Sequence, residues 1–351
     1  MPKKNLTIAD IAHMAGVSKT TVSRYLNEKY EFMSEDTRLR IKAVIENANY
    51  QPNNIARSLK SHKSMLIGLV VADIESPFSS AVIKSVGDAM NNTGYNIIIA
   101  NSDKSPKKEQ SIIQSLLGQK IDGLIINTTQ RQNPFLINIA NGGLPVVLLD
   151  RDVTDYKFDY AFIENKSPIR EAVLHLHQEG FGNIAYITQT PHEQISPRLY
   201  RRRAHIETLT ELGVQNAADF VYDIEDNQNS VCAAVKQLMK QSANDTAPPA
   251  IITSNGVTLM RVAQAIRSLG LHMPNQIGLC GYDEWGWASE LGWAQLMNVG
   301  ISTLTPSIDQ LGKLTVKALL NRIQNPGSKK VHVSVPAPLH VRTSTKLSDF
   351  K

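Results

Sequence analysis

Cysteine is scarce in this sequence of 351 residues, which contains Cys232 and Cys280 and no others. Neither has a neighbouring cluster of Cys or His, so we expect buried thiols rather than a disulfide or a metal site. His175 and His177, which are two residues apart, do not suggest a metal site either, because side chains at this spacing on a helix point to different faces. No cofactor is expected.

Long apolar runs are also missing. No run approaches the ~20 residues needed to span a bilayer, and the N-terminal stretch MPKKNLTIADIAHMAG lacks the continuous apolar core of a signal peptide. We therefore expect a cytoplasmic protein with no membrane partner.

The sequence offers no nucleophile beside a base, no glycine loop for phosphate and no set of metal ligands, so we do not expect an enzyme. In an enzyme, the acid-base work would fall to Asp150 and Asp283.

The length and the distribution of charge indicate a protein with more than one domain. A chain of 351 residues exceeds one ordinary compact domain, so two or three domains are expected. Residues 1–63 carry eleven Lys and Arg against six Asp and Glu, whereas the remaining 26 cations and 26 anions cancel. The net charge of +5 therefore lies in the N-terminal part, which predicts that this part binds a polyanion.

Residues 1–50 predict three short helices. The stretch LTIADIAHMAG is typical of a helix that is capped by Thr7 with Asp10 and ended by Gly16, and further helices would begin after Ser18 and Ser34. Two helices joined by a turn that contains glycine form a helix-turn-helix unit, whose second helix can enter a DNA major groove.

That second helix carries side chains suited to base edges. Lys19 and Arg24 can donate hydrogen bonds to guanine, and Thr20 can bond to a base or contact a thymine methyl group, whereas hydroxyls and helix N-termini would hold phosphates. The alternative is a solvated three-helix domain with scattered charges. The predicted DNA contacts here are Thr7, Ser18, Lys19, Thr20, Thr21, Ser23, Arg24 and Asn27.

The stretches TIADIAHMAGVSKTTVSRYLN and TRLRIKAVIENANYQPNNIARSL resemble the N-terminus of the LacI/GalR family of bacterial transcription regulators. This resemblance implies that residues 51–63 form a hinge, which becomes helical only when two protomers sit together on operator DNA. The matching residues are Pro52, Asn53, Ala56 and Leu59.

Physical chemistry supports such a hinge independently. A helix shorter than ~12 residues is marginal alone in water, so packing against a second copy on DNA would make its folding part of binding. Leu59 would then be an apolar wedge in the minor groove, with Arg57 facing the backbone. The alternative is a flexible linker.

Residues 64–351 alternate short apolar runs with helical stretches, in two successive series. This pattern predicts two doubly wound parallel-sheet lobes, similar to periplasmic binding proteins, with a ligand cleft at the carboxyl ends of the strands. The fold class is therefore an all-α helix-turn-helix head plus an α/β body. The resemblance implies an N-lobe of about 64–163 and 301–328 and a C-lobe of about 164–300 and 329–345.

The residues that follow the predicted strands are polar in both lobes, which predicts a small-molecule site. Structural alternatives exist for each, since an Asp at a strand end often caps the next helix and a Trp often fills a core. The resemblance implies effector-binding roles for Asp150, Arg201 and Asp283, and Asn127 and Asn255 also match. The full predicted set is Asp73, Ser76, Phe78, Asn127, Asp150, Arg201, Ile224, Asn255, Asp283 and Trp285.

The sequence also departs from the family pattern. Gly256 stands where an Asp usually follows Asn255, and Pro306 replaces a glutamine. Ile224 occupies the position of a stacking aromatic residue, which shifts stacking to Phe78 or Trp285.

The stretch DEWGWA resembles members that respond to keto-sugar acids such as 2-keto-3-deoxygluconate, and an arginine suits a carboxylate. We expect a sugar acid, with a neutral sugar as the alternative.

Taken together, these features predict a homodimeric repressor that reads a near-palindromic operator under allosteric control by a sugar or sugar acid. A solute-binding protein of a transporter would share the body, but it would need an export signal and no helix-turn-helix. The sign of the ligand effect, release or recruitment of DNA, stays open.

Leu59→Ala tests the predicted wedge. Removing the apolar side chain should weaken operator binding without changing ligand affinity in the DNA-free protein, because the wedge acts only on the bent duplex. Fluorescence anisotropy with an operator probe measures this, and unchanged operator affinity would remove Leu59 from the wedge role.

Overall fold

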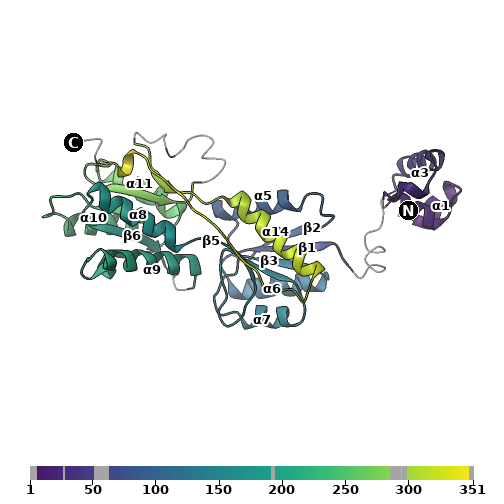
Figure 1. The fold of residues 1–351 in the computed structure, drawn as a ribbon, viewed down its shortest axis with the longest axis horizontal. Coiled ribbons are helices and arrows are strands. Elements are labelled where there is room, and N and C mark those ends of the chain that lie inside the picture. Colours follow the sequence, from purple (N-terminus) through teal and green to yellow (C-terminus); the bar gives the residue numbers. More distant parts are fainter. Residues whose placement is uncertain are drawn as a thin grey trace. The chain divides into compact units, whose positions relative to one another are not determined.

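The computed structural model describes residues 6–26, 28–50, 63–190, 194–284, 294 and 299–347. They belong to two compact units, Met1–Ser64 and Met65–Lys351, which Figure 1 shows. The predicted hinge helix lies outside the described residues. So do the predicted contact residues Asn27, Asn53, Ala56, Arg57, Leu59 and Trp285.

The first unit is helical, as predicted. It consists of α1 (Ile8–Met14), α2 (Lys19–Leu26), the 3-10 helix η1 (Tyr30–Phe32) and α3 (Glu35–Asn47). Its core contains Ile11, Val22 and Ile41, which are fully buried. One apolar residue from each α-helix therefore holds the three together, and the predicted helix-turn-helix arrangement is confirmed.

The helix starts of this unit are fixed by hydroxyl caps. The backbone N–H of Thr7 donates to Asp10 (2.7 Å) and the N–H of Asp10 donates to Thr7 Oγ1 (3.3 Å), which confirms the predicted capping box. Ser18 accepts from the N–H of Thr21 at 3.1 Å. Gly16 has φ +63°, the left-handed conformation that suits the turn between the first two helices.

The second unit contains two lobes built from strands and helices in alternation. The N-lobe begins with β1 (Leu66–Val71), α5 (Pro77–Met90), β2 (Asn96–Asn101), α6 (Pro106–Gly118), β3 (Gly123–Ile126), α7 (Pro134–Asn141), β4 (Val146–Leu149) and β5 (Asp159–Ile163). The C-lobe follows with α8 (Lys166–Glu179), β6 (Ile184–Gln189), α9 (Ser196–Glu211), η2 (Ala217–Phe220), β7 (Val221–Ile224), α10 (Gln228–Gln241), β8 (Ala250–Thr253), α11 (Gly256–Ser268), β9 (Gly278–Tyr282) and β10 (Ser302–Leu304). The remaining elements are α14 (Ile308–Gln324), β11 (His332–Val335), β12 (Leu339–His340) and η3 (Thr343–Thr345).

Each lobe has a six-stranded sheet, and the two strand orders correspond. The N-lobe order is β11-β5-β4-β3-β1-β2 and the C-lobe order is β12-β10-β9-β8-β6-β7. The described strand pairs are parallel except for β10 with β12. The predicted pair of doubly wound lobes is confirmed, and β4 of one lobe corresponds to β9 of the other.

The sheet pairing moves two of the predicted lobe boundaries. β10 pairs with β9, so residues 302–304 belong to the C-lobe rather than to the N-lobe. β11 pairs with β5, so residues 332–335 belong to the N-lobe rather than to the C-lobe. The chain therefore crosses to the N-lobe after β10 and returns to the C-lobe after β11, where β12 pairs with β10 at the edge of the C-lobe sheet.

The helix between these crossings packs closely on the N-lobe. Figure 1 shows α14 beside α5, and at Gly312 a Cβ atom would lie only 2.0 Å from the Ser85 hydroxyl oxygen. Glycine therefore allows the two helices to approach. Among the described residues, no helix is long and apolar enough to cross a membrane.

A buried ion pair locks the end of α14 to the N-lobe sheet. Arg322 donates from Nε to Asp159 Oδ2 (2.7 Å) and from Nη2 to Oδ1 (3.1 Å), and both side chains are almost fully buried. Arg322 also donates to the main-chain oxygens of Pro326, Ser328 and Lys329, so one guanidinium fixes the turn that leads into β11.

Arg322→Met should lower the free energy of unfolding by about 3–5 kcal/mol, because the buried Asp159 carboxylate loses its hydrogen-bonded guanidinium and retains Lys330 at 4.0 Å. Urea unfolding followed by circular dichroism measures the change. The matched control is Lys313→Met on the same helix, which breaks an exposed pair with Asp309 and should cost less than about 1 kcal/mol. Equal effects in the two variants would contradict the assigned role of the buried pair.

Candidate functional site

A cavity of about 290 Å³ lies between the lobes at the carboxyl ends of their strands. Residues that follow β1, β3 and β4 form its N-lobe side, and residues at the ends of β6, β8 and β9 form its C-lobe side. Eight of the predicted effector residues line it, namely Asp73, Ser76, Phe78, Asn127, Asp150, Arg201, Asn255 and Asp283. The structure thus brings together side chains from positions far apart in the sequence.

Two aspartates occupy corresponding positions in the two lobes. Asp150 follows β4 with φ +63°, and Asp283 follows β9 with φ +72°, so each carboxylate leaves its strand from a left-handed residue. Asp283 accepts from the N–H of Gly256 at 3.2 Å, whereas Asp150 Oδ1 is buried and accepts no hydrogen bond in the described part of the chain. Burial raises the pKa of both carboxyls, although Arg201 opposes the rise. An unsatisfied buried acceptor suits a ligand hydroxyl.

Arg201 on α9 interacts electrostatically with both aspartates and has only 5% of its surface exposed. Its Nε donates to Asn165 Oδ1 (2.8 Å), its Nη1 donates to the Ser254 main-chain oxygen (2.7 Å), and its Cζ lies 3.4 Å from the centre of the Tyr282 ring. Burial acts to lower the pKa of Arg201, but its interactions with Tyr282, Asp283 and Asp150 outweigh burial and the net shift is upward. The guanidinium therefore stays charged inside the cleft.

Three further arginines line the cavity; Arg261 forms an ion pair with Asp226, and the other two are Arg198 and Arg151. Arg198 lies one helical turn before Arg201 on α9 and donates from Nη2 to Gln189 Oε1 at 2.8 Å. Arg151 donates from Nη1 to the Thr128 main-chain oxygen at 3.0 Å. Burial, together with the charge of Arg151, lowers the pKa of Arg198 to about 10. The two guanidiniums thus stay protonated at neutral pH but repel each other.

Neutral oxygens hold three of the four cavity arginines, Arg151, Arg198 and Arg201, which are called the cleft arginines below. Within the described chain, none of the three forms an ion pair with a carboxylate at 4.0 Å or less. Arginines elsewhere in the body are held differently, since Arg322 pairs with Asp159 and Arg342 pairs with Glu284 at 2.9 Å. The cleft therefore orients positive charge without neutralising it by direct pairing.

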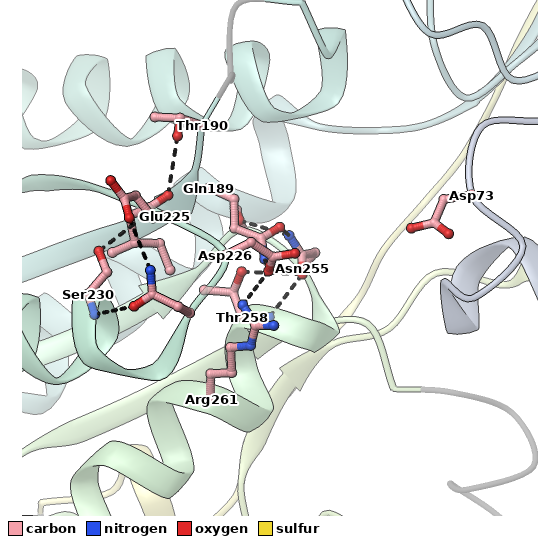
Figure 2. Close-up of polar contacts among 12 residues, drawn as sticks. Asp73, Gln189, Thr190, Glu225, Asp226, Ser230, Asn255, Thr258 and Arg261 are labelled. Carbon is pink, nitrogen blue, oxygen red and sulfur yellow. Dashed lines mark hydrogen bonds and ion pairs between the residues drawn. The ribbon is translucent and has the colours of Figure 1, made fainter. Parts of the chain in front are cut away.

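The C-lobe rim of the cavity carries a polar network, which Figure 2 shows. Gln189 Nε2 donates to Asp226 Oδ1 (2.8 Å), and Asp226 forms an ion pair with Arg261. Asn255 accepts from the N–H of Thr258 (3.0 Å) and so also caps α11. On the N-lobe side, Asp73 pairs with Lys104 at 2.8 Å.

The prediction that Ile224 contacts the effector is wrong. Ile224 is 1% exposed and packs in the C-lobe core rather than in the cavity. Side chains alternate along a strand, and this alternation turns Ile224 toward the helix-covered core with Tyr222. The residue that reaches the cavity from this strand end is Asp226.

Sequence reasoning also missed Gln189, Arg198, Asp226 and Arg261. Two features of the sequence could have predicted Gln189 and Arg198. Gln189 ends β6, so it obeys the same strand-end rule that identified Asn127 and Asp150. Arg198 precedes Arg201 by three residues, a spacing that puts both on one face of a helix. Asp226 and Arg261 carried no comparable local signal.

The helical unit presents its predicted base-reading residues to solvent. Lys19, Thr20 and Arg24 are exposed on α2, opposite the buried Val22. The Cζ of Arg24 lies 5.3 Å from the centre of the exposed Phe32 ring. The hydroxyls of Ser18 and Thr21 contact each other at 2.9 Å at the start of the helix. Their contacts with DNA stay predictions.

A helix-turn-helix unit joined to a two-lobed body with a polar cleft defines a class of protein, the ligand-responsive DNA-binding regulators. Comparison with family models gives the same result. Residues 7–53 match the model described as bacterial regulatory proteins of the lacI family, and residues 64–340 match the one described as periplasmic binding proteins and sugar binding domain of the LacI family. The chain belongs to the LacI family.

Individual relatives match over nearly the whole length. The chain is 32% identical to the HTH-type transcriptional regulator KdgR of Bacillus subtilis, covering 96% of this chain and 97% of that protein. It is 31% identical to the regulator PtxS of Pseudomonas aeruginosa, with 97% and 96% covered. A solved lac repressor dimer bound to operator and the anti-inducer ONPF is 25% identical, covers 97% of this chain and 99% of its own, and has a TM-score of 0.81.

These matches establish the function at the level of the family. The protein is a DNA-binding transcriptional regulator of the repressor type, and its body matches the family's periplasmic-binding-protein and sugar binding domain. The family consists of transcriptional regulators rather than enzymes.

Asp150→Asn should raise the free energy of unfolding of the ligand-free protein near neutral pH. Its folded pKa lies above the unfolded value, so the ionised carboxylate destabilises the folded state. The gain should shrink as the pH falls from neutral toward the ordinary Asp pKa of about 3.9, because the wild-type carboxyl, whose folded pKa lies above that value, takes up a proton first in the folded state. Thermal unfolding at several pH values measures this.

The control is Asp155→Asn, which removes an exposed carboxylate from a residue with similar backbone geometry, φ +66°. It should change stability by less than about 0.5 kcal/mol. A loss of stability in Asp150→Asn at neutral pH would contradict the assigned cost of burying this charge.

Proposed function

We propose that the cleft binds a sugar acid and that this effector controls the affinity of a homodimer for a near-palindromic operator. The observation that carries the proposal is the set of three cleft arginines held only by neutral oxygens within the described chain. Such guanidiniums gain most from a ligand carboxylate, which can accept two parallel hydrogen bonds from one of them.

The polar groups around these arginines suit the hydroxyls of the same ligand. Asp150 Oδ1 is a buried acceptor without a donor in the described chain, and Asp283 faces the same cavity. The Asn127 amide is oriented by its hydrogen bond to the Leu149 main-chain oxygen (2.9 Å). Phe78 gives the cavity an aromatic surface on which a sugar ring or chain can lie. The two aspartates thus act as hydrogen-bond acceptors rather than as catalysts.

DNA binding is assigned to residues 1–50 and to the hinge at 51–63. Lys19, Thr20 and Arg24 would read base edges, and the hydroxyl residues of the same unit would hold phosphates. Two copies of the chain are needed for a near-palindromic site. The exposed apolar side chains of Ile74 and Ile99, the latter on the edge strand β2, favour an N-lobe contact between those copies.

Control by the effector follows from the position of the cleft. Groups from both lobes line the cavity, so a bound ligand stabilises one angle between the lobes. A change in that angle alters the spacing of the two hinges in the dimer and therefore the free energy of operator binding. The coupling works in both directions and amounts to ~1–3 kcal/mol in typical allosteric proteins.

A titration of a palindromic operator probe by fluorescence anisotropy tests this proposal, with D-gluconate, D-glucuronate, 2-keto-3-deoxygluconate, D-glucose and D-glucitol as ligands. We expect at least one acid to shift the operator affinity about tenfold, equivalent to about 1.4 kcal/mol. The neutral compounds serve as controls of similar size. A larger shift with a neutral compound would overturn the sugar-acid assignment, and no shift with any compound would overturn sugar control by the cleft.

A further inference from the structure

Gln189 connects the charged groups of the C-lobe rim. It is 7% exposed, and its Oε1 accepts from Arg198 Nη2 (2.8 Å) and from Asn255 Nδ2 (3.4 Å). Its Nε2 donates to Asp226 Oδ1 (2.8 Å), and its main-chain oxygen accepts from Arg198 Nη1 (3.3 Å). Figure 2 shows Gln189 between Asn255 and Asp226. Both polar atoms of the Gln189 side-chain amide therefore form hydrogen bonds.

The chemistry of this position favours an amide. The side chain must accept a hydrogen bond from a guanidinium and donate one to a carboxylate, and it must do so while buried. A carboxylate in its place has no N–H or O–H to donate, so it would repel Asp226, and an aliphatic side chain would satisfy neither group. Glutamine supplies both functions without a charge.

This arrangement holds Arg198 without neutralising its positive charge by direct pairing. Asp226 already forms an ion pair with Arg261, so its negative charge is shared with that residue. Gln189 orients Arg198 by two hydrogen bonds but contributes no charge. The guanidinium is thus held at the cavity wall in a medium of low dielectric constant, where an uncompensated charge attracts an anion more strongly than it would in water.

We propose that Gln189 is a specificity-determining residue, which makes the cleft selective for anionic ligands by holding Arg198 at the cavity wall without neutralising it. The inference rests on the proposed function, in which the cleft binds a small sugar-like effector. It adds the residue that decides between a charged ligand and its neutral counterpart.

Gln189→Glu tests the proposal with almost no change in side-chain size. The new carboxylate should form an ion pair with Arg198 and so compete with a ligand carboxylate. We expect the affinity for D-gluconate or 2-keto-3-deoxygluconate to fall by about tenfold or more, and the affinity for D-glucitol to change by less than about threefold. Isothermal titration calorimetry on the full-length protein measures both.

The ratio of the two affinities is the decisive quantity. A variant with a damaged fold would bind acid and neutral compound more weakly by the same factor, whereas loss of selectivity lowers the ratio. Arg198→Met should lower the ratio in the same way, and Gln189→Glu should change it less than about twofold when added to Arg198→Met. The matched control is Gln114→Glu on α6, which adds the same charge at an exposed position and should leave the ratio unchanged.

The possible results separate the two proposals. If the wild type binds a sugar acid and Gln189→Glu keeps the same ratio, the role of Gln189 is overturned and the proposed function stands. If the wild type prefers D-glucitol, or binds none of the probes, both are overturned. A lowered ratio in Gln189→Glu and Arg198→Met, with no change in the control, supports the inference.

Discussion

The burial of one positive charge between two lobes constrains the whole cleft. Arg201 is shielded from water, and it is held by Asn165 from the segment that joins the lobes and by the main chain that follows β8. A buried charge needs compensation, which here comes from Asp150 and Asp283, one from each lobe. The lobes thus share an electrostatic centre, and any ligand that enters it interacts with both.

The arginines of this protein are used in two distinct ways. Arg322 and Arg342 are paired with carboxylates and fasten late segments of the chain to the sheets. Arg151, Arg198 and Arg201 in the cleft are instead oriented by amide and main-chain oxygens. Pairing with a carboxylate within the protein favours a fixed structure, whereas orientation by neutral groups leaves binding energy for a ligand. Arg261 combines the two, since it lines the cavity and is paired with Asp226.

The predictability of each part depends on whether its signal is local. Helix caps such as Thr7 with Asp10 and the apolar runs of the central strands act within a few residues, so the head and the two lobes could be predicted. The strands β10, β11 and β12 lack the continuous apolar run of the central strands, and they belong to sheets begun far earlier in the chain. In the cleft, strand ends predicted Asn127 and Asp150. The side-chain direction of Ile224 and the contacts of Asp226 depend on packing, which the sequence does not display.

The double crossing between the lobes has a consequence for synthesis on the ribosome. The N-lobe lacks α14 and β11 until residue 335 has emerged, and the C-lobe lacks β12 until residue 340. The DNA-binding head, complete by residue 50, leaves the ribosome long before either lobe can close its sheet. During synthesis the chain therefore has a complete DNA-binding head while both lobes of its body are incomplete. Residues 308–340 then complete the two lobes almost simultaneously.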